Sequence, residues 1–239
     1  MNPPARGFDA TTDYWQHIVA ADALRVPLEP PYQRAYPARL PDGRYLVLPL
    51  RGMPSQPERC VASLIANQAS TEVVSTLASF MAERVRGLAF DAIVGLPTLG
   101  LTFAPLIAQA LGHPRYVPLG YSRKYWYREE LSEPVSSITT PGVGKLLYVD
   151  PNLLPMLNGQ RILVVDDAVS SGTTMGAGLR LLQRCGATVV GVAVAMRQGH
   201  QWRDLVRDAA GEPIAVFAAF DSPRMVRTPL GWMPEEATA

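Results

Sequence analysis

Uninterrupted apolar runs alternate with helical segments through most of the chain, and this alternation constrains the fold more than any other feature. Short runs typical of strands lie at residues 89–94, 115–118, 161–166, 188–196 and 214–220. Helical patterns separate them at residues 99–111, 174–185 and 202–209. Apolar runs without polar alternation belong to strands that are covered on both faces. The sequence therefore predicts an α/β fold with a parallel twisted sheet as its core and helices flanking that sheet.

The first part of the chain has a different character. Residues 1–57 contain ten prolines, and proline interrupts any long helix. The Asp42-Gly43 pair predicts a turn, and the apolar run at residues 45–48 predicts a strand beside it. We expect residues 1–57 to form an extended arm and a hairpin, which together make a small hood over the α/β core.

The remaining boundaries follow from the same patterns. Residues 58–86 carry apolar side chains at spacings of three and four, which predicts one long helix that ends at Gly87. We assign residues 58–220 to the α/β core and residues 221–239 to a C-terminal tail.

Composition excludes several classes of function. The chain of 239 residues has a formal net charge of +1, without the basic excess typical of nucleic-acid binders. Cys60 and Cys185 are too few for a disulfide framework or a cysteine zinc site, and the three histidines lack ligand spacing. No apolar run approaches the roughly 20 residues that span a bilayer, and the N-terminus lacks the apolar stretch of a secretory signal. We expect a cytoplasmic protein without membrane or nucleic-acid partners and without a metal site built from side chains alone.

The segment RILVVDDAVSSGTTMGAGL carries the sharpest chemical signal. Two carboxylates, Asp166 and Asp167, end a buried strand, and ligands of open α/β sheets bind at that edge. The hydroxyl-rich loop that follows opens a helix, whose free N–H groups and dipole favour an anion. Acids would repel a bare phosphate but would accept hydrogen bonds from the hydroxyls of a sugar phosphate. The alternative is an ordinary strand end with an aspartate that caps the next helix.

Residues 162–174 resemble the 5-phosphoribosyl 1-pyrophosphate (PRPP) binding motif of type I phosphoribosyltransferases, nearest to the adenine or purine type. A weaker resemblance extends over residues 89–220. The resemblance implies that Asp166 and Asp167 bind the ribose hydroxyls. It further implies that the 5-phosphate is bound by Ser170, Ser171, Gly172, Thr173 and Thr174.

Two further segments match this family. The turn after the first core strand corresponds to a pyrophosphate-binding turn and consists of Pro97, Thr98, Leu99 and Gly100. In the long polar segment at residues 121–150, Arg123 and Lys124 resemble the basic pair that reaches the pyrophosphate. An ordinary turn and a solvated basic loop are the alternatives.

The same polar segment supplies candidates for base recognition. Tyr125 and Trp126 would stack on a base if the loop closes as a lid, although they could also pack against a dimer partner. By resemblance to adenine-type members, a loop glutamate serves in acid–base catalysis, and the candidates are Glu129, Glu130 and Glu133.

The resemblance implies transfer of the 5-phosphoribosyl group from PRPP to a nitrogenous base, most simply a purine, with release of pyrophosphate. It implies Mg²⁺ held mainly by PRPP and water, a nucleobase as second substrate, and a homodimer. The main alternative is a non-catalytic PRPP-sensing regulator on the same fold. PRPP synthesis is disfavoured because the chain has one motif and no repeat, and a hydrolase on another α/β fold does not explain the acid pair.

Overall fold

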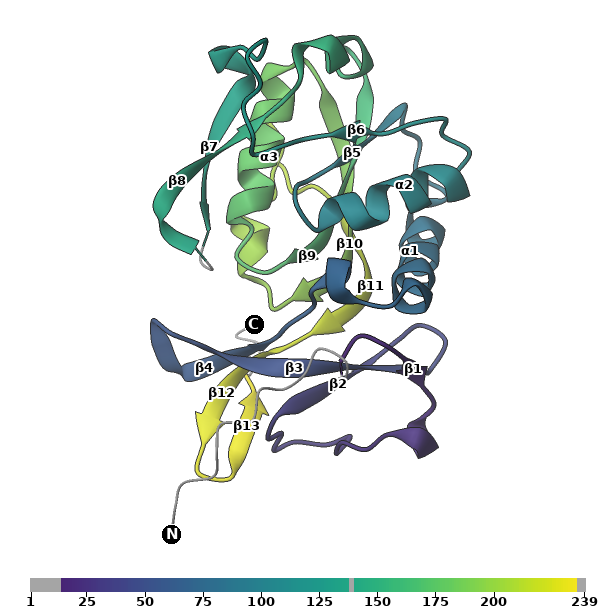
Figure 1. The fold of residues 1–239 in the computed structure, drawn as a ribbon, viewed down its shortest axis with the longest axis vertical. Helices are drawn as coiled ribbons and strands as arrows, with labels where there is room; N and C mark the ends of the chain where they lie inside the picture. Colours follow the sequence, from purple (N-terminus) through teal and green to yellow (C-terminus); the bar gives the residue numbers. More distant parts are fainter. Residues whose placement is uncertain (1–13, 138–139, 236–239) are drawn as a thin grey trace.

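Two large sheets with different hydrogen-bonding patterns build most of the described chain, and a two-stranded hairpin lies beside them (Figure 1). The structure, a computed structural model, describes residues 14–137 and 140–235. One sheet is parallel and carries helices on both faces, and the other is antiparallel and lies beyond one end of the parallel strands.

The parallel sheet has five strands in the order β11-β10-β9-β5-β6. Their bounds are Val216–Ser222 (β11), Thr188–Gln198 (β10), Arg161–Val169 (β9), Ala92–Gly95 (β5) and Val117–Pro118 (β6). The apolar runs form strands because helices exclude water from both faces. Ile162, Leu163, Val164 and Val165 are all fully buried. The predicted α/β fold with a parallel sheet and flanking helices is confirmed.

Three helices cover this sheet. Helices α1 (Thr71–Val85) and α2 (Gly100–Ala110) pack on one face, where Leu163 and Val165 join their cluster. Helix α3 (Thr173–Arg184) packs on the other face, against a cluster that contains Val164 and Val194. A hairpin of β7 (Ser132–Ser137) and β8 (Thr140–Tyr148) lies beside α3. Successive residues of one strand therefore serve two different cores, as the period of two requires.

The antiparallel sheet, which we call the hood, joins strands from the first 62 residues to two strands from residues 221–239, the segment that we expected to be a C-terminal tail. Its strand order is β1-β3-β4-β12-β13, and β2 also pairs with β3. The bounds are Ile18–Val19 (β1), Ala35–Arg39 (β2), Tyr45–Met53 (β3), Gln56–Ala62 (β4), Arg224–Thr228 (β12) and Gly231–Pro234 (β13). Strand β11 passes into β12 almost directly, so the hood lies next to the carboxyl ends of the parallel strands (Figure 1).

The prediction of one long helix at residues 58–86 is wrong for the residues before Thr71. Residues 56–62 form strand β4, which pairs with β3 on one side and β12 on the other. Cys60, Ala62 and Leu64 are buried in alternation, a strand pattern that overlaps the helical spacing. The helix begins only after Ser70, whose side chain accepts the Val73 N–H.

One smaller expectation also needs correction. The helix expected at residues 202–209 is a single 3₁₀ turn at Gln201–Asp204. The long polar segment at residues 121–150 contains the β7–β8 hairpin, with residues 138 and 139 outside the described chain. Within the described ranges, no helix is long and apolar enough to cross a bilayer.

Candidate active site

The acid pair lies inside strand β9 rather than after it. The strand continues to Val169 and stays paired with β10, with Asp166 opposite Val194. Asp166 is only 7% exposed, whereas Asp167 is partly exposed. Asp166 is therefore buried, whereas part of Asp167 is accessible near the carboxyl edge of the sheet.

Asp166 contacts the turn that follows β5. Its Oδ1 accepts the Asp167 N–H at 2.9 Å, and the carboxylate also accepts a backbone hydrogen bond from Gly100. A Cβ on Gly100 would lie 2.9 Å from that Oδ1 and 2.7 Å from the Val165 carbonyl oxygen. Only glycine therefore fits at the first residue of α2, and this close approach brings the turn against the acid pair.

Both acids resist ionisation. Burial, and then the charge of Asp167, raise the pKa of Asp166 well above its ordinary value. Burial also raises the pKa of Asp167, to about 6. Among the described residues, no lysine or arginine forms an ion pair with either carboxylate. The pair is suited to a ligand that brings hydroxyl donors or a cation.

The hydroxyl-rich loop after β9 turns sharply into α3. The Ser171 hydroxyl lies 3.0 Å from the Thr173 hydroxyl and accepts the Thr173 N–H at 3.3 Å. Gly172 has φ +82°, and a Cβ there would lie 2.9 Å from the Cα of Trp202. Glycine at this position is therefore required by the neighbouring 3₁₀ turn as well as by the backbone conformation. Ser170 and Thr174 complete the loop and are partly exposed.

Two helix N-termini thus meet the acid pair. The N-cap positions of α2 and α3 are Leu99 and Gly172, and neither has a side chain that accepts from the first turn. Pro97 and Thr98 precede Leu99 in the turn, and the peptide bond between them is cis. The first N–H of each helix already has an acceptor, Asp166 for Gly100 and the Ser171 hydroxyl for Thr173. Within the described chain, the other first-turn N–H groups have no capping side chain and can bind anions. The arrangement offers two anion sites on either side of two carboxylates.

The basic and aromatic loop residues lie at the surface. Arg123 and Lys124 are exposed, and within the described chain no ion pair or hydrogen bond joins them to the acid pair. The side chain of Tyr125 is 97% exposed, while the Trp126 indole N–H lies 3.3 Å from both carboxylate oxygens of Asp150. The structure therefore does not bring these four residues together with the acids.

The three glutamate candidates differ in surroundings. Glu129 and Glu130 are exposed on a 3₁₀ turn before β7. Glu133 is only 8% exposed, and its two carboxylate oxygens accept from Arg180 and Arg184 of α3. Glu133 thus ties the β7–β8 hairpin to α3, and its oxygens are not free for proton transfer.

Sequence reasoning missed Tyr121. Burial, and then the charges of Asp166 and Asp167, raise the pKa of its phenol. The Nζ of Lys145 lies 5.4 Å from the centre of that ring. Tyr121 follows the carboxyl end of β6, and the rule that sites form at such ends could have identified it.

Comparisons with known proteins identify the family. The family profile described as the phosphoribosyl transferase domain matches residues 61–211. A hypoxanthine/guanine phosphoribosyltransferase of Methanobrevibacter ruminantium is 28% identical over 62% of this chain and 74% of its own length. An adenine phosphoribosyltransferase of Parafrankia sp. is 32% identical over 53% of this chain and 68% of its own length.

Solved structures share the fold. The adenine phosphoribosyltransferase of Rhodothermus marinus aligns with a TM-score of 0.54 and 20% identity, over 73% of this chain and 93% of that one. The Giardia lamblia enzyme, solved with 9-deazaadenine, aligns with a TM-score of 0.57 and 14% identity, over the same two fractions. At these identities the likeness shows the fold alone.

Proposed function

Because the chain belongs to the phosphoribosyl transferase family, we propose that it transfers the 5-phosphoribosyl group of PRPP to a nitrogenous base and releases pyrophosphate. The observation that carries this proposal is the acid pair beside two helix N-termini whose N-cap residues, Leu99 and Gly172, provide no capping side chain. PRPP has the matching order of groups, with a phosphate at one end, two ribose hydroxyls in the middle and a pyrophosphate at the other end.

Each group of PRPP has a proposed partner. The ribose hydroxyls donate to Asp166 and Asp167, which relieves the repulsion between the two neighbouring carboxylates. The 5-phosphate lies in the loop formed by Ser170, Ser171, Gly172, Thr173 and Thr174. The pyrophosphate accepts from N–H groups at the turn of Pro97, Thr98, Leu99 and Gly100, with Arg123 and Lys124 reaching it when the loop closes.

Mg²⁺ is the proposed cofactor, held mainly by the substrate and water. Among the described residues, no group of three histidine, cysteine or acidic side chains could hold an ion by itself. The donor set nevertheless fits, because Asp166 and Asp167 are two uncompensated carboxylates beside the proposed pyrophosphate turn. When bound, Mg²⁺ neutralises charge on the leaving pyrophosphate.

The proposed reaction breaks the bond between the ribose C1 and the pyrophosphate oxygen and forms a bond from C1 to a base nitrogen. Positive charge develops on the ribose ring as pyrophosphate leaves, and the nearby carboxylates favour that charge. The base loses one proton, which Glu129 or Glu130 accepts after loop closure, while Tyr125 and Trp126 stack on the ring. Positioning supplies most of the remaining rate.

A purine is the proposed base, because the motif at residues 162–174 resembles that of purine-type members; relatives named for adenine and for orotate match the chain at similar identity, so the test includes both base classes. A homodimer in the cytoplasm is the proposed assembly and location.

Pyrophosphate release measures the activity directly. Purified protein, PRPP and Mg²⁺ are mixed with each of a panel of purine and pyrimidine bases. We expect release with at least one purine, and none with the Asp166→Asn/Asp167→Asn double variant. Calorimetric binding of PRPP without release on any base would support the sensor instead, and absence of both would reject the site.

A further inference from the structure

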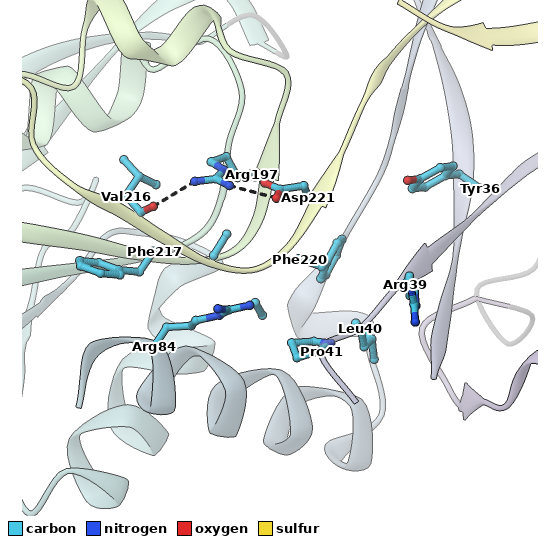
Figure 2. Close-up of a pocket in the computed structure, with 12 residues that line it drawn as sticks. Tyr36, Arg39, Leu40, Pro41, Arg84, Arg197, Val216, Phe217, Phe220 and Asp221 are labelled. Carbon is cyan, nitrogen blue, oxygen red and sulfur yellow. Dashed lines mark hydrogen bonds and ion pairs between the residues drawn. The ribbon is translucent and has the colours of Figure 1, made fainter. Parts of the chain in front are cut away.

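A groove separate from the acid pair runs along the outer edge of the parallel sheet (Figure 2). It has a volume of about 660 Å³ and lies between strand β11, the β2–β3 turn of the hood and the end of α1. We call it the edge groove. Strand β11 is two strand spacings from β9, on the order of 10 Å, and no residue of the acid pair or its loops lines the groove.

The edge groove is strongly cationic. Arg39 comes from the hood, Arg84 from α1 and Arg197 from the carboxyl end of β10. Arg197 is neutralised by Asp221, with contacts of 2.6 and 3.0 Å to its two carboxylate oxygens. Arg39 and Arg84 make no ion pair or hydrogen bond through their side chains to any other described residue. Two guanidinium groups on opposite walls are thus available for an anion, and guanidinium binds phosphate in a bidentate manner.

Aromatic rings lie along the same groove. Phe217 and Phe220 lie on β11, where Phe220 is only 4% exposed and belongs to the core, and Tyr36 extends from the hood with its hydroxyl toward the cavity (Figure 2). Burial, and then Tyr32 and Asp221, raise the pKa of Tyr36 to about 12, so its hydroxyl stays a donor at neutral pH. Tyr36 and Phe217 are partly exposed, so these two rings offer apolar surface to a flat ligand between the two free arginines.

The backbone of β11 adds a third feature. Within the described chain β11 pairs only with β10, so alternate residues direct their N–H and C=O groups to the groove. Val216 and Ala218 are the alternate residues whose backbone groups point to the groove. The Val216 carbonyl already accepts a hydrogen bond from Arg197 at 3.2 Å, so Ala218 is the next residue that offers its N–H and C=O groups. A free strand edge presents a donor and an acceptor side by side, and the edge of a nucleobase presents the complementary pair.

We propose that the edge groove binds a nucleoside phosphate, with the base against β11 and the aromatic rings and the phosphate between Arg39 and Arg84. The volume lies within the range of about 300–1,000 Å³ that holds small molecules. Inorganic phosphate would use only the arginines, and a sugar phosphate would leave the strand edge and the rings without partners.

Calorimetry with the full chain tests this site without any turnover. A product nucleotide would also bind the acid pair, so the titrations use the Asp166→Asn/Asp167→Asn background. AMP, GMP and UMP are the probes. We expect at least one of these probes to bind with a stoichiometry of one molecule per chain. Adding Arg39→Ala/Arg84→Ala to that background should lower the affinity for this nucleotide at least tenfold.

A matched control removes two arginines from the same two elements. Arg44 pairs with Asp42 on the hairpin turn and Arg86 pairs with Glu83 at the end of α1, and neither lines the groove. Arg44→Ala/Arg86→Ala should leave affinity within twofold, and ribose 5-phosphate and inorganic phosphate should bind at least tenfold more weakly than the nucleotide. Equal weakening by both double variants, equal affinity for inorganic phosphate, or no binding of any probe would overturn the proposal. None of these results bears on pyrophosphate release, so the two proposals can fail separately.

Discussion

At the scale of single residues, Asp166 and Asp167 place like charges side by side in a buried strand. Both carboxyls have a raised pKa in the folded protein, so the native state binds more protons than the unfolded chain at mildly acidic pH. The stabilisation that Asp167 contributes in its protonated form is therefore lost as the pH rises through about 6, its pKa in the folded protein. The pKa of Asp166 is also raised, so its contribution is lost in the same direction as the pH rises. The free protein is destabilised at neutral pH by the groups proposed to bind ribose.

Replacement of Asp167 should separate stability from binding. Asp167→Asn removes one of the two charges, so we expect the ligand-free protein to gain on the order of 2 kcal/mol at pH 7 while PRPP affinity falls at least tenfold. Denaturant unfolding between pH 5 and 8 measures the first effect and calorimetry the second. Asp22→Asn, at an exposed position in the hood arm, is the control and should change neither. Lower stability at pH 7 in Asp167→Asn would contradict the electrostatic argument.

Gly172 tests the packing behind the proposed phosphate loop. Gly172→Ala places a Cβ 2.9 Å from the Trp202 Cα and also strains the backbone, so we expect a loss of about 2–4 kcal/mol. Gly112 has a similar φ of +75° but open space around it, so Gly112→Ala should lose only about 1 kcal/mol. The difference between the two midpoints in urea isolates the contact with Trp202, and equal losses would show that the contact is not tight.

At the scale of elements, one carboxylate joins the β7–β8 hairpin to α3. Glu133 lies 2.7 Å from Arg180 Nε and 2.5 Å from Arg184 Nη1, while both arginines are about half exposed. Burial opposes ionisation of Glu133, but the two arginines together outweigh burial and lower its pKa. The stabilisation is present above the ordinary glutamate pKa and is lost as pH falls through the lower folded-state pKa.

Glu133→Gln should loosen the hairpin. We expect the free energy of unfolding to fall by about 1–2 kcal/mol at pH 7. The loss is modest because the arginines remain partly hydrated when their partner is removed. It should disappear in strong acid, where Glu133 of the unchanged protein is protonated. The backbone amides of residues 132–135 should also exchange their hydrogens faster in Glu133→Gln than in the unchanged protein. Glu83→Gln, which breaks the exposed pair with Arg86, should cost less than about 0.5 kcal/mol. Equal effects of the two variants would contradict the role given to Glu133.

At the scale of the whole molecule, hood and sheet share a core. Leu46 and Leu48 of β3 belong to the same buried cluster as Ile93 of β5 and Leu163 of β9. The buried Gln198 side chain donates to the Ala62 carbonyl at 2.9 Å and adds a polar contact between β10 and β4. A shared core of this kind predicts that hood and sheet unfold together.

The two cysteines provide separate reporters of that prediction. Cys60 lies in β4 of the hood and Cys185 at the end of α3; both are buried, and burial raises the pKa of each thiol. A thiol reagent should modify neither in the native protein. Cys60→Ala retains only Cys185, and Cys185→Ala retains only Cys60. Along a urea gradient, the remaining thiol of each variant should become reactive at the same midpoint. Distinct midpoints would show that the hood opens by itself.

Local chemistry let the sequence predict the parallel sheet and the acid pair with its loop. Residues 162–165 are apolar without alternation because helices cover both faces of β9, and such a run needs no distant information to interpret. The strand at residues 56–62 could not be predicted in this way, because its partner β12 begins at Arg224, far along the chain. Apolar residues at 60, 62 and 64 satisfy either period until that partner is known.

The sequence by itself determined the elements whose signal is local: the buried parallel strands and the small-residue loop that opens a helix. It placed the acids at the end of the strand, whereas β9 continues past them to Val169. The tertiary structure decided which carboxylate is buried against Gly100, which glutamate is held by arginines, and that Arg39, Arg84 and Phe217 share one groove. The reason is physical. Periodicity and turn chemistry act over a few residues, whereas burial, pKa and a shared cavity depend on side chains that only the folded chain brings together.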